Sequence, residues 1–180
     1  MSKAWRDYPS HMDRSEGPNY EITAAMQRIA TAITRSERIV VLSGAGISTE
    51  SGIPDFRGPD GVWTKNPGAE RKATIQNFVN DRNHRIQSWK NRIMNSENPK
   101  PNRAHFALVD LEKKGKLATL ITQNIDSLHL QAGTNVERLI EIHGTTRDYI
   151  CLECSDRGPI EEVLLRVENG EDDPVCKKCR

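Results

Sequence analysis

The chain has 180 residues, and its 26 basic and 25 acidic side chains nearly cancel, so bulk attraction to nucleic acid or to an anionic membrane is not indicated. The length suits one ordinary domain, or one domain with a small inserted module. No apolar run approaches the roughly 20 residues that span a bilayer, and the polar N-terminus lacks the apolar core of a signal peptide. We therefore expect a cytoplasmic protein in which residues 1–19 form a flexible tail.

The first predicted elements are a helix and a strand. Residues Tyr20–Arg35 carry apolar side chains at helical spacing, which predicts an amphipathic helix. The apolar run Ile39–Leu42 is too short for a helix and lacks the alternation of a half-exposed strand. We therefore expect it to be a buried strand at the centre of a parallel sheet. The apolar face of the helix consists of Ile22, Met26, Ile29 and Ile33.

A glycine-rich turn follows this strand directly. Gly44 and Gly46 would let the backbone approach a pyrophosphate, and the N–H groups of a helix beginning near Ile47–Thr49 would face its charge. The spacing is not the usual dinucleotide fingerprint, because Thr49 stands where the third glycine belongs. On the glycines alone, a tight structural turn is an equally good interpretation. The continuation Ser51–Gly58 mixes turn residues with an aromatic ring, a carboxylate and a guanidinium, which favours a ligand site.

The middle of the chain is predicted to be helical. The segment Ala69–Met94 has apolar residues at helical spacing, is expected to break once near Asn80–Asn83, and is best explained as a packing face. Asn102 is expected to cap the next helix, which Gly115 ends.

Two more buried strands are predicted, over Leu117–Ile121 and Leu139–Ile142. Strands that alternate with helices imply right-handed crossovers and a parallel sheet, with ligands at the carboxyl ends of the strands. Polar motifs follow all three predicted strands and should therefore meet at one edge. The expected fold class is α/β, with a parallel Rossmann-like (doubly wound) sheet that is incomplete in this chain.

All four cysteines lie within the last 30 residues, as two Cys-x-x-Cys pairs. The pairs Cys151/Cys154 and Cys176/Cys179 are separated by 21 residues, which is close to the spacing of a zinc ribbon. Four thiolates would close the tetrahedral shell of a structural Zn²⁺ and leave no position for water. A redox pair is the alternative, and two disulfides fit a reducing cytosol less well.

Three blocks of this sequence resemble the sirtuins, the NAD-dependent protein-lysine deacylases. The blocks are Gly44–Gly58, Thr122–Gly133 and Glu141–Gly144, and the cysteines follow them. The resemblance implies a Rossmann-like domain with a small helical module and a four-cysteine zinc-ribbon module. It implies NAD+ and structural Zn²⁺ as cofactors, acyl-lysine proteins or peptides as substrates, and nicotinamide, O-acyl-ADP-ribose and deacylated lysine as products.

The candidate catalytic residues follow the second and third strands. A lone histidine such as His143 is more often structural, but imidazole titrates near neutral pH, and the resemblance makes His143 the general base for a ribose hydroxyl. Asn124 and Asp126 would orient water and the nicotinamide ribose, unless they only cap the following helix. His105 and His129 lie inside predicted helices, where packing or capping accounts for them.

The resemblance also implies a cofactor-binding set. Within it, Phe56 would shield the sugar from water, Arg57 would lie near phosphate or ribose oxygens, and Ile53 would lie near the carboxamide. Ser48 and Thr49 are explained nearly as well as plain helix-start residues. The whole set is Gly44, Ala45, Gly46, Ile47, Ser48, Thr49, Ile53, Pro54, Asp55, Phe56, Arg57, Trp63, Gln123, Asn124, Ile125 and Asp126.

Sirtuins continue beyond the second cysteine pair, so we expect this chain alone to bind NAD weakly and to show little deacylase activity. The alternatives are ADP-ribosyl transfer or NAD hydrolysis at the same site, and a non-enzymatic zinc-braced interaction module. A dehydrogenase is disfavoured by the missing third glycine. The expected segments are 1–19 (tail), 20–66 (NAD-binding domain), 67–98 (helical module), 99–147 (NAD-binding domain, continued) and 148–180 (zinc module).

Overall fold

The computed structural model describes residues 20–94 and 99–179, so the predicted tail lies outside the described residues. The described chain forms two compact units, divided between Glu37 and Arg38. The first unit holds helix α1, Tyr20–Arg35, which confirms the predicted amphipathic helix. None of the described helices is long and apolar enough to cross a membrane.

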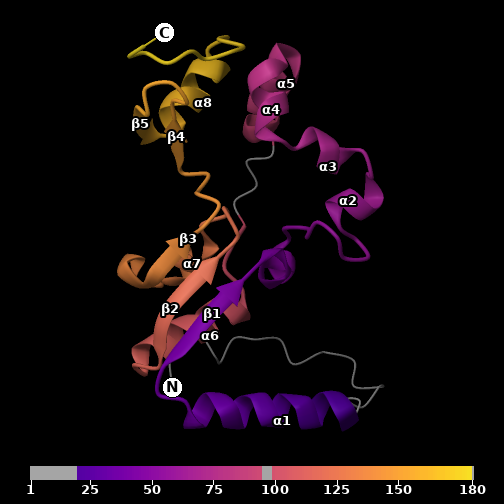
Figure 1. The fold of residues 1–180 in the computed structure, drawn as a ribbon, viewed down its shortest axis with the longest axis vertical. Helices are drawn as coiled ribbons and strands as arrows, with labels where there is room; N and C mark the ends of the chain where they lie inside the picture. The colour runs from indigo at the N-terminus through magenta and orange to yellow at the C-terminus, as the bar shows by residue number, and fades with distance from the viewer. Residues whose placement is uncertain (1–19, 95–98, 180) are drawn as a thin grey trace. The chain divides into compact units, whose positions relative to one another are not determined.

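The second unit is built on a parallel sheet of three strands, drawn as arrows in Figure 1. The strands are β1 (Ile39–Ser43), β2 (Leu117–Thr122) and β3 (Leu139–Glu141), in the order β1-β2-β3. Ser43 pairs with Thr122, and Thr122 pairs with Glu141, so the last residues of all three strands lie side by side. The predicted parallel sheet is confirmed, and its three polar motifs follow one edge.

Helix α6 (Arg103–Lys113) packs on β2, and α7 (Leu128–Ala132) packs on α6. This layer contains the fully buried side chains of Leu117 and Leu120 from β2 and of Leu128 from α7. A leucine that loses all its exposure contributes about 1.5–3 kcal/mol to folding, so this layer holds the sheet together. As predicted, Asn102 caps α6, with its side chain accepting from Ala104 N at 2.9 Å, and Gly115 takes φ +72° beyond the helix end.

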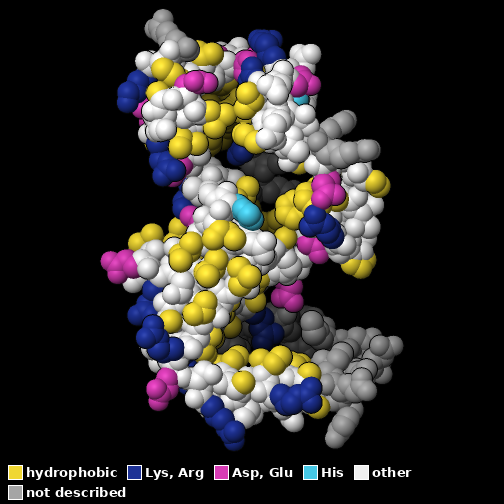
Figure 2. All heavy atoms as spheres, in the orientation of Figure 1, with side chains coloured by type: hydrophobic (Ala, Val, Ile, Leu, Met, Phe, Trp, Pro, Cys, Tyr) yellow, Lys and Arg dark blue, Asp and Glu magenta, His cyan; other side chains and the backbone are white. Residues whose placement is uncertain are grey.

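The prediction that β1 is a buried central strand is wrong for the described residues. Val40 is 63% exposed and Leu42 is 65% exposed, and Figure 2 shows hydrophobic side chains gathered over the strands on the visible face. Val40 and Leu42 alternate with the half-buried Ile39 and Val41, so the two exposed side chains lie on one open face of the strand, opposite the buried Ser43. Among the described residues β1 pairs with β2 alone, so it is an edge strand there. An uninterrupted apolar run identifies a strand but does not distinguish the centre of a sheet from its edge.

The predicted helical segment Ala69–Met94 is divided into shorter helices: α3 (Ala69–Lys72), α4 (Ile75–Asn80) and α5 (Arg82–Met94). A short helix that was not predicted, α2 (Val62–Lys65), precedes them. The predicted break near Asn80–Asn83 is confirmed at Asp81. A second break was not predicted; there Thr74 caps α4 by accepting from Asn77 N. Phe78 and Trp89 pack edge to face across α4 and α5, with 5.8 Å between ring centroids.

The last segment is a small ribbon of β4 (Asp148–Ile150) paired antiparallel with β5 (Arg157–Pro159), followed by α8 (Glu161–Glu168). It is joined to the helical segment by ion pairs. Arg85 on α5 donates twice to the carboxylate of Asp173, at 2.7 Å each, and Lys90 pairs with Asp172 at 2.8 Å. Two-point contacts between a guanidinium and a carboxylate fix the orientation of both groups, so these ion pairs hold α5 in a defined position against this last segment.

Candidate functional site

Two loops meet at the carboxyl edge of the sheet and are joined by side-chain hydrogen bonds. The amide of Asn124, two residues beyond β2, donates to Gly44 O and to Ser48 Oγ at 3.1 Å each. Ser48 is fully buried and donates to Asp126 Oδ2 at 2.7 Å. Four predicted site residues from sequence positions about eighty apart are thus brought together.

Gly44 has no side chain, which allows the loop after β2 to approach the glycine-rich turn closely. A Cβ at this position would lie 3.3 Å from Nε2 of Gln123, a residue whose backbone N–H donates to Ser43 O at 3.0 Å. The following residues form a 3-10 helix, η2 (Ala45–Ser51), so the predicted helix beginning near Ile47–Thr49 starts earlier and is wound more tightly.

Asp126 combines two contacts. Its Oδ1 accepts from Leu128 N at 3.0 Å, at the start of α7, while its Oδ2 accepts from Ser48. Asp126 therefore makes the contact to the helix start that capping predicts, and its bond to Ser48 is a second contact that capping alone does not explain. Asn124 does not cap α7, because its amide is directed across the edge to η2.

The loop 53–63 forms its own aromatic cluster. The rings of Phe56 and Trp63 are 4.6 Å apart, and the guanidinium of Arg57 lies 4.5 Å from the Trp63 ring and 2.7 Å from Glu70. Gly61 is required here, since a Cβ would lie 2.6 Å from the carbonyl of Phe56. In this conformation the described contacts of Arg57 are within the loop and to α3, and not with the glycine-rich turn.

His143 lies in the turn after β3, and its side chain is exposed. Ile142 N donates to Thr122 O at 3.1 Å, which keeps this turn beside the end of β2. Gly144 takes φ +77°, a left-handed conformation that glycine adopts without strain. The structure thus places His143 at the predicted edge, with its ring open to solvent.

The other predicted cofactor residues follow the same two loops. Thr49 Oγ1 donates to Gly46 O at 3.0 Å, which supports its interpretation as a helix residue. Ile125 O accepts from both N and Oγ1 of Thr146, so the loop after β2 is joined to the turn after β3. The remaining members lie on η2 or the loop behind it: Ala45, Ile47, Ile53, Pro54 and Asp55.

Sequence reasoning missed a further support of η2. Asn102, predicted only as a helix cap, also donates from Nδ2 to Ile47 O at 2.7 Å and to Ser51 Oγ at 3.0 Å. The capping position was visible in the sequence, but no local pattern indicates a partner fifty residues away.

Beneath this edge lie two buried histidines, His105 and His129, with 4.9 Å between ring centroids. His105 Nδ1 accepts from Asn102 N at 3.3 Å, so the capping interpretation is confirmed for His105. Burial lowers the pKa of His105. Burial and the neighbouring His105 lower the pKa of His129 to about 4, against the opposing carboxylates of Asp126 and Glu141. Both rings are neutral at neutral pH.

Acid is expected to destabilise the fold through His129. The unfolded chain takes up this proton near pH 6.5 and the folded chain only near pH 4, so the unfolded state binds more protons between these values. The contribution is present above this window and is lost as pH falls through it, by about 3 kcal/mol. Urea unfolding at a series of pH values measures the loss. His129→Gln should flatten the dependence, and His84→Gln on α5 should not; equal slopes for the two variants would contradict this.

The four cysteines form a compact cluster whose sulfur atoms all lie within 4.8 Å of one another. Sγ of Cys151 is 3.6 Å from Sγ of Cys179, and Sγ of Cys154 is 3.7 Å from Sγ of Cys176. A disulfide needs about 2.05 Å, so these are not disulfides. Tetrahedral zinc at ~2.3 Å from each sulfur separates the sulfurs by ~3.8 Å, which the cluster fits.

The backbone favours the metal-binding form of one thiol. N–H groups of Cys179 and Lys178 lower the pKa of Cys176 to about 6. Thiolate is the form that ligates zinc. Four sulfur ligands complete the coordination of the ion, so it would stabilise the ribbon and would not activate water.

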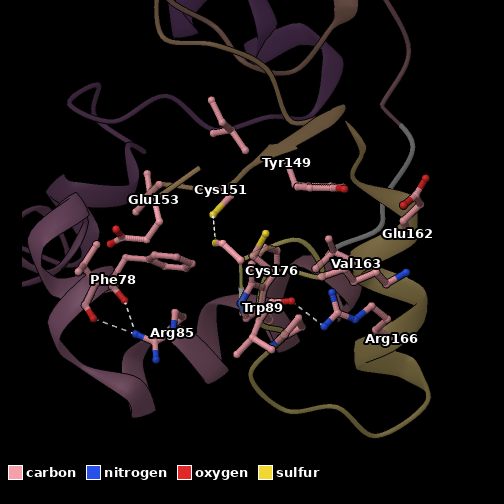
Figure 3. Close-up of a pocket in the computed structure, with 17 residues that line it drawn as sticks. Phe78, Arg85, Trp89, Tyr149, Cys151, Glu153, Glu162, Val163, Arg166 and Cys176 are labelled. Carbon is pink, nitrogen blue, oxygen red and sulfur yellow. Dashed lines mark hydrogen bonds between the residues drawn. The ribbon is translucent and has the colours of Figure 1, made fainter. Parts of the chain in front are cut away.

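A cavity of about 330 Å³ lies beside the cysteine cluster. Figure 3 shows Phe78 and Trp89, from α4 and α5, around it with Cys151, Cys176 and Val163. The cavity therefore belongs to the ribbon and the helical segment, and none of its lining residues is one of the sheet-edge residues.

These features define a parallel α/β domain with polar loops joined at the carboxyl edge of its sheet, the usual place for a ligand, and a four-cysteine metal-binding module. Residues 44–180 match the Sir2 family. NAD-dependent protein deacetylase 2 of Streptomyces coelicolor is 45% identical over 148 residues, which cover 82% of this chain and 61% of that protein. The NAD-dependent protein deacetylase of Thermodesulfovibrio yellowstonii is 48% identical over 150 residues, covering 82% of this chain and 56% of that protein.

Solved structures agree. One described as Sir2 with a p53 peptide and NAD+ has a TM-score of 0.70 at 38% identity, covering 86% of this chain and 60% of that one. Sir2Tm bound to a propionylated peptide has a TM-score of 0.71 at 35% identity, covering 86% and 59%. The chain belongs to the Sir2 family, the sirtuins. It spans about 60% of the length of these relatives, 61% and 56% for the two deacetylases.

Proposed function

We propose that this chain carries the cofactor and catalytic edge of an NAD-dependent protein-lysine deacylase. The observation that supports it most is the joined set Gly44, Ser48, Asn124 and Asp126, which follows two parallel strands at the edge where such folds bind nucleotides. The names of the relatives support the same activity. The products would be nicotinamide, O-acyl-ADP-ribose and free lysine.

Bound NAD+ would supply an electrophilic ribose carbon from which nicotinamide departs. His143 would accept a proton from a ribose hydroxyl, since its exposed ring lies at the ligand edge. Asn124 and Asp126 would present an amide and a carboxylate to the sugar, where positive charge develops. Phe56, 48% exposed on its loop, would exclude water from the sugar.

The metal and the partners complete the proposal. Cys151, Cys154, Cys176 and Cys179 would hold a structural zinc ion, and acyl-lysine side chains of proteins or peptides would be the substrates. A p53 peptide and a propionylated peptide accompany two similar structures. The cytoplasmic location, the absence of nucleic-acid and membrane binding and the five segment boundaries stay predictions.

Product analysis tests this function. We would replace the matching residues of the Streptomyces coelicolor deacetylase by this sequence and incubate the chimera with NAD+ and an acetyl-lysine peptide. Nicotinamide and O-acetyl-ADP-ribose are expected in equal amounts, and only when the peptide is present. Free ADP-ribose without peptide would indicate an NAD hydrolase, and a folded chimera without products would contradict deacylation. The 180-residue chain, assayed alongside, is expected to show little turnover.

A further inference from the structure

A buried chain of hydrogen bonds runs from α7 to the loop after β2. His129 Nε2 is 2.9 Å from Ser43 Oγ, and Ser43 Oγ donates to Thr122 Oγ1 at 2.9 Å. Thr122 Oγ1 also accepts from Asn124 N at 3.1 Å. His129, Ser43 and Thr122 are at most 6% exposed, so water does not replace these contacts.

The hydrogen bonds determine which ring nitrogen of His129 carries the proton. A serine hydroxyl has one proton, and that of Ser43 is given to Thr122. Ser43 Oγ therefore accepts from His129 Nε2–H. The other ring nitrogen, Nδ1, is buried and has no hydrogen-bond partner among the described residues, which fits a neutral ring whose single proton is on Nε2.

We infer that His129 is a positioning residue for Asn124, acting through Ser43 and Thr122. Thr122 holds the Asn124 backbone, and the Asn124 side chain then reaches Gly44 and Ser48. If this acceptor were lost, the Asn124 N–H would be unpaired and the loop would be free to turn. A displacement of ~1 Å in a catalytic group can cost ~10²-fold in rate. The consequence for turnover rests on the proposed function, whereas the positioning itself does not.

Substitutions at Thr122 test the inference in the chimera. Thr122→Val keeps the volume but removes the acceptor, and kcat is expected to fall by about 10- to 100-fold with little change in peptide KM. Thr122→Ser keeps the hydroxyl and should restore kcat. His129→Leu should resemble Thr122→Val, and His129→Gln, which keeps a donor, should lose less. Thr134→Val is the matched control, because this buried threonine hydroxyl has no hydrogen-bond partner among the described residues.

Hydrogen exchange in the 180-residue chain separates the inference from the proposed function. The backbone N–H of Asn124 should exchange faster in Thr122→Val and His129→Leu than in Thr134→Val. Thr122→Ser should restore the protection of this backbone N–H. Unchanged exchange would overturn the inference. Faster exchange with kcat at the level of Thr134→Val would overturn the catalytic role of the positioning. Faster exchange in a chimera that forms no products at all would count against the proposed function and leave the positioning supported.

Discussion

Removal of zinc by a chelator is expected to unfold residues 148–179 while the sheet of β1, β2 and β3 stays folded. The ribbon has two strands of three residues, and the buried apolar residues that it contributes are Ile160, Val163 and Val167. So small a core cannot support itself. Zinc binding supplies about 10–16 kcal/mol to zinc-finger peptides at neutral pH, which is as large as the whole unfolding free energy of a typical domain, about 5–15 kcal/mol.

The unfolding should extend to helix α5. Arg85 is held by Asp173, which lies between α8 and the second cysteine pair, and this carboxylate is mostly buried. When the ribbon loosens, Arg85 loses its two-point partner. We therefore expect faster exchange in residues 82–94 as well as in 148–179.

Hydrogen exchange with mass spectrometry measures this effect with and without chelator. Cys154→Ser and Cys176→Ser should reproduce the apo state, and zinc should restore protection in the unmodified chain only. Lys177→Ala is the matched control, since this exposed residue lies between two ligands and removes none of them. Protection of 148–179 that survives both chelation and ligand substitution would contradict a structural zinc.

Replacement of His143 by alanine is expected to reduce kcat for acetyl-peptide turnover in the chimera by roughly 10²- to 10⁴-fold, the usual contribution of a general base. The ring is exposed, so the free energy of unfolding should change by less than about 0.5 kcal/mol. A fall in kcat without a fall in the free energy of unfolding would therefore show that His143 acts in the reaction and not in folding.

Steady-state kinetics and urea unfolding on the same samples check this expectation. His84→Ala provides the control, because this histidine lies on α5 in the helical segment. NAD+ binding by His143→Ala, measured by calorimetry, should remain within a few-fold of the parent. Turnover that matches His84→Ala would show that His143 is not the base.

Much of the local structure follows from the sequence alone. Apolar runs predicted all three strands of the sheet, Asn102 and Gly115 predicted the ends of α6, and the cysteine spacing predicted a four-sulfur cluster. These features depend on residues close together in the chain, where side-chain periodicity, capping and left-handed turns act directly.

Tertiary structure decided what depends on distant partners. It left one face of β1 open in the described part of the chain, paired Arg57 with Glu70, and used Ser48 as the buried link between Asn124 and Asp126. It also joined His129 to Ser43, eighty-six residues away, where a helical position had indicated only packing or capping. Hydrogen bonds between buried groups form wherever the fold brings a donor and an acceptor together. Local sequence patterns do not indicate which distant residues will become neighbours.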